Sequence, residues 1–348
     1  MKKLLSIMFA ILILVPVMAS AHEIKPTPFA IEGRVTYDFE PSSAVPGPMN
    51  AYTSEYTFID ADMAAKVLFD DEDYLVQAIY DDDKGLDYVV CSSDSAQLRS
   101  DRYGYLTYST ENIKYSKDIL TYAFDDNASD NLSFMSKADA IKLCEDTFEK
   151  LGISAQAYEI ESFDIAALKK LSDENRDEQQ EWLDLGKEAY IKDDWTQDDE
   201  CYRIKLYQTI DGIPVTARGY YIKSRDLPLG GTYLDALVTR SGVEYIYAYG
   251  LLKTLEAADS ITPCTQKEAL KAYITEKNST VEGMDIHLAG MEMRYVPVAI
   301  PGENQTKKVT MTPVWMLAMQ FDQTEGDVVR TYIYEVYRDI TNGEDITK

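Results

Sequence analysis

Apolar and polar residues alternate with a period of two along much of the second half of the chain, the pattern of strands with one buried face. Tyr202, Ile204 and Leu206 alternate with more polar residues, and Asp211-Gly212 is typical of a hairpin turn. The same pattern predicts strands over residues 213–222, 234–239, 243–249, 284–298, 309–321 and 328–337. We therefore expect antiparallel sheets built from consecutive strands.

Two helices are predicted by their capping residues and by the helical spacing that follows them. Ser136 and Asp139 form a capping box, and apolar residues recur at helical spacing over residues 140–151. Thr265 and Glu268 form a second capping box. Each helix precedes a set of predicted strands, so a helix-plus-sheet unit that occurs twice is one interpretation. Any two capped helices would share this pattern, which is the alternative.

These elements predict an α+β fold with tandem helix-plus-antiparallel-sheet units. Upstream of them, a helix from Asp60 and short Tyr- and Val-rich strands predict an additional N-terminal α+β region. We expect a signal peptide over residues 1–21, the N-terminal region over 22–130, a first unit over 131–258 with a charged helical insertion at about 172–200, and a second unit over 259–348. The insertion is expected to cover a sheet and not to form a separate domain.

The chain is strongly acidic. Its 348 residues include 34 Lys and Arg against 60 Asp and Glu, for a net charge of −26. A nucleic-acid backbone would be repelled by such a field, which excludes nucleic-acid binding. General disorder is also excluded, because 45% of the residues are hydrophobic, with 26 Tyr and 10 Phe to fill cores.

The first residues have the organisation of a signal peptide. Lys2 and Lys3 are followed by an apolar stretch over residues 4–17, and Ala19 and Ala21 are the small residues of a cleavage site. The apolar stretch is shorter than the ~20 residues of a spanning helix, so an uncleaved anchor is the less favoured alternative. We expect secretion to the extracellular side of the cell envelope, with no stable membrane anchor after cleavage.

The four cysteines are Cys91, Cys144, Cys201 and Cys264, too far apart for C-x-x-C pairs. Cys144 falls on the apolar face of a predicted helix, where a free buried thiol is common. A core of this size does not need disulfides, although three pairings are possible. We expect mostly free, buried thiols and no structural metal site.

Several segments resemble PepSY-type and thermolysin-propeptide-type modules. The helix starts at 136–140 and 265–269 resemble their S/T-x-x-E-A motif, and YQTIDGIPV at 207–215 resembles their hairpin. That hairpin is also similar to one in the YpeB and YycH/YycI groups of exported Gram-positive proteins. TPVW at 312–315 and DITNGE at 339–344 resemble the ending of PepSY repeats.

This resemblance covers patches of residues 133–345 and is mainly structural. Asn342 before the final glycine and the long insertion before Cys201 depart from it. The resemblance implies a helix packed on a curved antiparallel sheet, used for protein contacts or peptidase inhibition. It implies no catalytic residues.

Candidate chemistry is sparse. The sequence lacks G-x-S-x-G, H-E-x-x-H and P-loop motifs, and it has two histidines, His22 and His287. His22 would be the mature N-terminus and could chelate copper only with His287, which lies in a strand-like alternation typical of a sheet histidine. The tryptophans Trp182, Trp195 and Trp315 could stack on sugars, but buried aromatic residues are the usual interpretation.

Acidic turns invite a calcium interpretation. Residues 81–87 and 322–327 each combine aspartates with a glycine, but the glycine does not fall at position 6 of an EF-hand loop. Solvated acidic turns are therefore favoured over a specific calcium site.

Tyrosines at alternating positions are the remaining candidate site: Tyr220, Tyr221, Tyr245, Tyr247, Tyr249, Tyr332, Tyr334 and Tyr337. Tyrosine suits an interaction surface because it combines apolar area with a hydroxyl group. Strand propensity and cover by the insertion would explain the pattern equally well.

The sequence therefore favours an exported, non-catalytic protein that binds or regulates an envelope protein, with an exported peptidase as one candidate partner, and that uses no cofactor. The alternatives are a carboxylate-based carbohydrate-active hydrolase and an envelope ligand- or calcium-binding module.

The first prediction concerns export. The secreted chain should begin at His22, because Ala19 and Ala21 fit the small pockets of signal peptidase. Intact-mass spectrometry of secreted protein checks this, and recovery of Met1 would contradict it.

Overall fold

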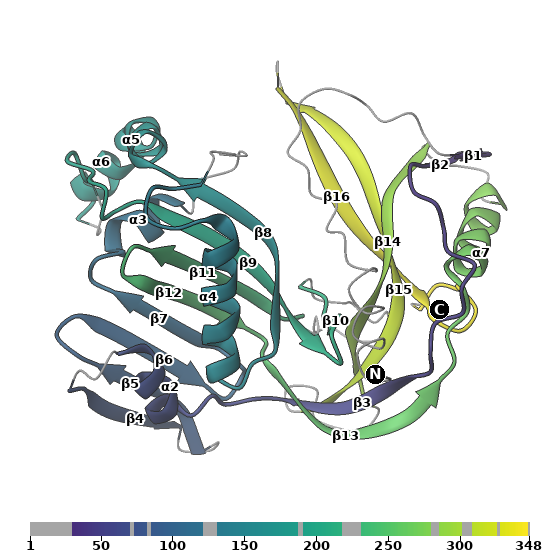
Figure 1. Ribbon diagram of the computed structural model, residues 1–348, viewed down its shortest axis with the longest axis horizontal. Helices are drawn as coiled ribbons and strands as arrows, with labels where there is room; N and C mark the ends of the chain where they lie inside the picture. The colour runs from purple at the N-terminus through teal and green to yellow at the C-terminus, as the bar shows by residue number, and fades with distance from the viewer. Residues whose placement is uncertain are drawn as a thin grey trace, which may run out of the picture.

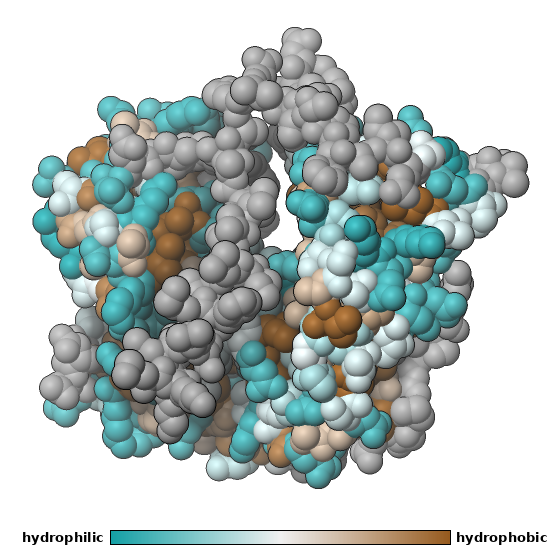
Figure 2. Space-filling view, turned by 45° about the vertical axis from the view of Figure 1, so that its right-hand side comes forward, coloured by the Kyte–Doolittle hydropathy of each residue, from teal (hydrophilic) through white to brown (hydrophobic). Residues whose placement is uncertain are grey.

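The computed structural model describes residues 30–69, 73–81, 85–120, 131–186, 191–217, 231–279, 285–300, 308–325 and 328–346. In these ranges the chain forms two β-sheets and six helices, which confirms the α+β class. Each sheet builds one lobe, and the lobes join on one side of the molecule and part on the other (Figure 1, Figure 2). The expected signal peptide lies outside the described residues. None of the described helices is both long and apolar enough to span a membrane.

The larger sheet has nine strands, all paired antiparallel. In spatial order they are β4 (Leu75–Asp81), β5 (Gly85–Ser92), β6 (Ala96–Asp101), β7 (Leu106–Thr110), β12 (Gly242–Tyr249), β11 (Tyr233–Thr239), β9 (Cys201–Ile210) and β10 (Ile213–Pro214), and β8 (Ala155–Phe163) also pairs with β9. The hairpin expected at Asp211-Gly212 joins β9 to β10. Both residues have positive φ, 51° and 75°, as a two-residue hairpin turn requires.

One face of the nine-stranded sheet is covered by helices. The helix α4 (Lys137–Lys150) crosses it, and α2 (Ala61–Leu68) lies over β5 and β6 (Figure 1). Ser136 caps α4 by accepting a hydrogen bond from the backbone N–H of Asp139 at 3.2 Å. Because Ala140, Cys144 and Phe148 recur at helical spacing, all three are buried against the sheet.

The smaller sheet has seven strands: β1 (Ala30–Glu32), β2 (Val35–Tyr37), β14 (Ile286–Ala299), β15 (Lys308–Glu325), β3 (Met49–Tyr56) and β13 (Leu252–Ile261) in spatial order, with β16 (Val328–Asp339) also on β15. Its pairs are antiparallel except for β2 with β14. The helix α7 (Gln266–Ser279) packs on one face through Leu270, Tyr273 and Ile274. Thr265 and Glu268 cap it with reciprocal hydrogen bonds.

The charged insertion is more helical than expected. The sequence predicts a helix around residues 179–190, of which 187–190 lie outside the described residues; the structure has α6 (Arg176–Asp184) there and α5 (Ile165–Glu174) before it. The earlier start follows from Asp164, whose side chain accepts the Ala167 N–H at 2.8 Å. With the short helix α3 (Lys114–Ile119), α5 and Trp195 form a separate apolar cluster against Leu237 of β11.

The two sheets do not follow the expected domain boundaries. The region 22–130 contributes β1 to β3 to the smaller sheet and β4 to β7 to the larger one. The strand β13 runs across the expected boundary at 258 and pairs with β3, so that Leu252 lies opposite Tyr56. Such long-range pairings carry no local sequence signal. Each capped helix does lie on a sheet, α4 on antiparallel strands and α7 on strands that include the parallel pair β2 and β14, but a tandem duplication stays a prediction.

The burial of the cysteines gives a second prediction. All four are free in the structure; Cys91, Cys144 and Cys201 are buried and Cys264 is partly exposed. Burial also raises the pKa of each thiol, which slows its reaction further. A maleimide should therefore modify Cys264 alone in the native protein and all four thiols in guanidinium. Mass spectrometry without reducing agent checks this, and a crosslinked cysteine pair would contradict it.

Candidate functional site

The face of the nine-stranded sheet opposite α4, here called the tyrosine face, carries polar and aromatic side chains, and α3 and α5 pack against one part of it around Leu237. It exists because strand residues alternate between faces. On β9, Ile204 and Leu206 are buried under α4, so Arg203, Lys205 and Tyr207 point to the other side. The register of the neighbouring strands places Asp235 beside Lys205 and Tyr247 beside Asp235.

A shallow hollow of about 510 Å³ lies on this face. Tyr245, Tyr247 and Tyr105 contribute aromatic walls, and α3 contributes Lys114 and Lys117. The rest of the lining is mainly hydroxyl and amide groups together with two carboxylates: Ser92, Ser93, Gln97, Thr107, Ser109, Thr110, Glu111 and Asp118. The hollow can therefore offer stacking, hydrogen bonds and charges of both signs to a ligand.

The tyrosines around the hollow hold one another in place. The ring of Tyr247 packs edge-on against Tyr105 at 5.5 Å and against Tyr233 at 6.0 Å between centroids. Edge-to-face contacts of this kind are favourable beyond the area they bury. The rings are therefore ordered before any ligand arrives.

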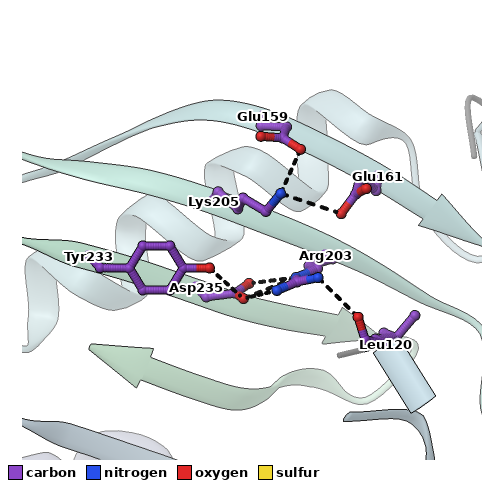
Figure 3. Close-up of polar contacts among 7 residues, drawn as sticks. All are labelled: Leu120, Glu159, Glu161, Arg203, Lys205, Tyr233 and Asp235. Atoms are coloured by element: carbon purple, nitrogen blue, oxygen red, sulfur yellow. Dashed lines mark hydrogen bonds and ion pairs between the residues drawn. The ribbon is translucent and has the colours of Figure 1, made fainter. Parts of the chain in front are cut away.

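A buried ion pair lies next to these tyrosines (Figure 3). Both carboxylate oxygens of Asp235 accept hydrogen bonds from Arg203, at 2.7 to 3.2 Å, and Tyr233 donates a further bond at 3.1 Å. Arg203 also donates to the carbonyl of Leu120 at 3.1 Å, which ties this face to the end of α3. Burial alone would lower the pKa of Arg203, but the hydrogen bonds to Asp235 raise it, so the guanidinium stays charged.

Lys205 forms a second group of charges with β8. Its ammonium lies 2.7 Å from a carboxylate oxygen of Glu159 and 3.9 Å from one of Glu161 (Figure 3). Burial raises the pKa of Glu161, and Lys205 only partly opposes that effect. Glu161 therefore holds a proton more readily than an exposed glutamate, although both Lys205 and Arg203 act to lower its pKa.

The side chains of Arg203, Lys205, Tyr207 and Asp235 form a band of aromatic and charged groups, here called the polar band. This band continues into the smaller sheet. Tyr207 stacks on Tyr158 with centroids 3.9 Å apart, and the guanidinium carbon of Arg294 lies 3.7 Å from the centre of the Tyr207 ring. Arg294, on β14, is 4% exposed and donates to Glu292 at 2.7 Å. Tyr207 and Arg294 thus connect the two sheets by a stacked cation–π contact.

The tyrosines predicted from the sequence as an interaction surface do not all lie in one place in the structure. Tyr245 and Tyr247 line the hollow, and Tyr249 follows them on the same face, 47% exposed. Tyr220 and Tyr221 lie outside the described residues. The three tyrosines of β16 belong to the other sheet and are not brought together with these.

Those three tyrosines point to opposite sides of the smaller sheet. Tyr334 is 53% exposed, and strand alternation places it and Tyr332 on the same side as Val336, which packs toward α7. Tyr337 points the other way, is 8% exposed, and hydrogen-bonds Glu335 and Thr216. Burial raises its pKa, so the phenol stays protonated. A single surface of eight tyrosines is therefore not formed by the described residues.

The sequence does not predict that the charged residues of the polar band are paired. Arg203 and Lys205 look like the solvent-facing half of an alternating strand. One signal was available: Asp235 interrupts a strand that is otherwise apolar, and a buried carboxylate needs a cation on a neighbouring strand.

The other candidate chemistries find little support in the described residues. His287 lies within 3.1 Å of the Thr36 hydroxyl and 3.5 Å of an Asp38 oxygen, as a sheet histidine with local partners. Trp195 and Trp315 are buried. No group of three or more His, Cys, Asp or Glu side chains with metal-binding geometry occurs in the described part of the chain.

A double-mutant cycle tests the buried ion pair. Asp235→Leu should lower the free energy of unfolding by about 3 kcal/mol, because it leaves Arg203 buried without its carboxylate. Adding Arg203→Met should recover a large part of that loss, since both charges are then gone. Urea unfolding of the two single variants and the double variant measures this coupling, and strictly additive losses would contradict it.

No family model and no curated protein matches the chain. Among solved structures, an uncharacterized protein from Eubacterium rectale is similar, with a TM-score of 0.64 and 13% sequence identity, covering 90% of this chain and 91% of that chain. At this identity the similarity concerns the fold alone. The two-sheet architecture is thus found over most of the length of that bacterial protein, whereas the resemblance to PepSY-type modules stays a prediction.

Proposed function

We propose that this protein is an exported, non-catalytic binding protein that holds a segment of a partner protein on the tyrosine face of its nine-stranded sheet. The observation that carries the proposal is the hollow of about 510 Å³ with Tyr245 and Tyr247 in its walls. Tyrosine offers apolar area and a hydroxyl group at low cost in side-chain entropy, which is why it is common at binding surfaces.

The side chains that line the hollow are already held in fixed positions, which supports binding. Tyr247 is fixed between Tyr105 and Tyr233, and Tyr233 is in turn fixed by its hydrogen bond to Asp235. A surface whose side chains are already ordered loses little entropy when a ligand arrives. The hydroxyl and amide groups of Gln97, Thr107 and Ser109 can pair with the backbone of a bound segment.

The pairing of Asp235 and Glu159 favours binding over hydrolysis at these two carboxylates. A glycosidase needs one carboxylate that is free to donate a proton and a second that is free to attack or to activate water. On this face both oxygens of Asp235 are held by Arg203, and Glu159 is held by Lys205. Asp235 and Glu159 therefore stabilise the fold and are not free for catalysis.

The partner that we propose is an envelope protein, with an exported peptidase as one form of it. The support is the helix capped at Ser136 and the helix capped at Thr265, each packed on one face of a sheet as in PepSY-type modules. Export rests on the signal-peptide pattern of residues 1–21.

The binding proposal predicts which tyrosines matter. The double variant Tyr245→Ala with Tyr247→Ala should weaken capture of the partner at least tenfold, because aromatic residues at the centre of an interface contribute about 2 kcal/mol or more each. The assay is a pull-down from a cell-envelope extract with residues 22–348 as bait, followed by titration of the recovered protein.

The matched control is Tyr334→Ala, which removes an exposed tyrosine from the other sheet and should leave capture unchanged. Thermal unfolding of each variant separates loss of binding from loss of fold. Equal capture by the double variant and the wild type would overturn the proposal, as would robust peptide or glycoside hydrolysis by the purified chain.

A further inference from the structure

The strand β4 is an open and apolar edge of the nine-stranded sheet. Among the described strands it pairs only with β5, and it lies at the outer end of the sheet (Figure 1). Its side chains are unusually exposed: Leu75 is 81% exposed, Val76 is 54% and Tyr80 is 69%. From Leu75 to Tyr80 the strand has neither a charge nor a proline.

One edge of the other sheet, the strand β13, is protected in the ways that folded proteins commonly use. β13 contains two register shifts and carries Lys253, Glu256 and Asp259 along its exposed length. Bulges and charges on an edge strand prevent another strand from pairing with it. The single register shift of β4 lies near its end, between Ile79 and Tyr80, so the stretch before it keeps a regular edge.

The charges around β4 indicate what kind of strand could pair with it. In the sequence, four acidic residues at 70–73 precede the strand and three at 81–83 close it, with Lys84 as the first cation after them. Because Asp73 precedes β4 and Asp81 is its last residue, a strand paired along β4 would have an acidic residue near each of its ends, whichever direction it runs. Basic residues on both sides of an apolar core complement this arrangement.

A second copy of the chain fits this edge poorly. If two β4 strands paired antiparallel, the acidic run before one strand would face the acidic run after the other. Opposed like charges are destabilising, and the whole chain carries a net charge of −26.

We propose that β4 binds an extended segment of a partner protein, with alternating apolar residues and Lys or Arg on both sides, as an added strand of the nine-stranded sheet. Backbone hydrogen bonds to the free edge supply affinity, and contacts with Val76 and Tyr80 supply preference for apolar residues. This inference is independent of the tyrosine-lined hollow, which is formed by other strands of the sheet and by α3.

The test uses residues 22–348 and three labelled peptides in a fluorescence-anisotropy titration. The peptide KKVTVTVKK is the basic strand, EEVTVTVEE reverses the flanking charge, and KKVPVPVKK keeps the charge but loses two backbone donors and much of its strand-forming capacity. The basic strand should bind at least tenfold more tightly than either of the others. It should also slow hydrogen exchange at the amides of β4.

Two variants with the same charge change locate the site. Val76→Lys with Tyr80→Lys places two cations on the edge and should weaken binding of KKVTVTVKK at least tenfold. Leu183→Lys with Leu185→Lys on and beside α6 replaces two residues that are 44% and 69% exposed, and should change binding less than twofold. Equal losses in the two variants would mean that net charge alone attracts the peptide, which would overturn the proposal.

Two further outcomes would overturn it. Equal binding of KKVTVTVKK and KKVPVPVKK would exclude strand addition. Sedimentation that shows a wild-type dimer abolished by the β4 variant would identify a second copy as the occupant. The variant Tyr245→Ala with Tyr247→Ala should still bind the peptide, so failure at the hollow and failure at the edge are distinguishable.

Discussion

The alternation along β9 is the constraint on which the rest of the structure depends. Ile204 and Leu206 must be buried under α4, and the same backbone then sends Arg203 and Lys205 to the opposite face. A charge at the centre of a nine-stranded sheet is costly unless it is paired. Asp235 on β11 and Glu159 on β8 supply the partners from the two neighbouring strands. The polar band is thus a consequence of how the core is made.

Local signals explain which elements could be predicted. The capping boxes at Ser136 and Thr265 and the turn at Asp211-Gly212 each specify a structure within a few residues, and all three occur as expected. The strand partners could not be predicted in this way. β3 and β13 pair across about two hundred residues, and no residue pattern in either strand indicates that the other is its partner. The N-terminal region therefore looked like a separate unit, although its strands complete both sheets.

The candidate site shows the same division between local and long-range information. Tyr245 and Tyr247 could be predicted because alternation within one strand puts them on one face. Their neighbours Tyr105 and Tyr233 come from the residue before β7 and from β11, so the hollow itself could be predicted only with the order of the strands in the sheet. The tyrosines of β16 show the limit of the pattern, since alternation cannot say which sheet a strand joins or how deeply it is covered.

Acidity and the open edge are connected. An apolar edge strand without charge or proline is an aggregation hazard, because any extended chain can pair with it. The acidic residues on either side of β4 raise the cost of pairing with another copy of this chain, whose own flanks are equally acidic. The same charges do not oppose a basic strand, and they accelerate its approach. Under our proposal, a strongly negative chain can therefore keep a free edge and still select a basic strand to pair with it. Register shifts and charged residues along the strand itself, as on β13, would block every incoming strand.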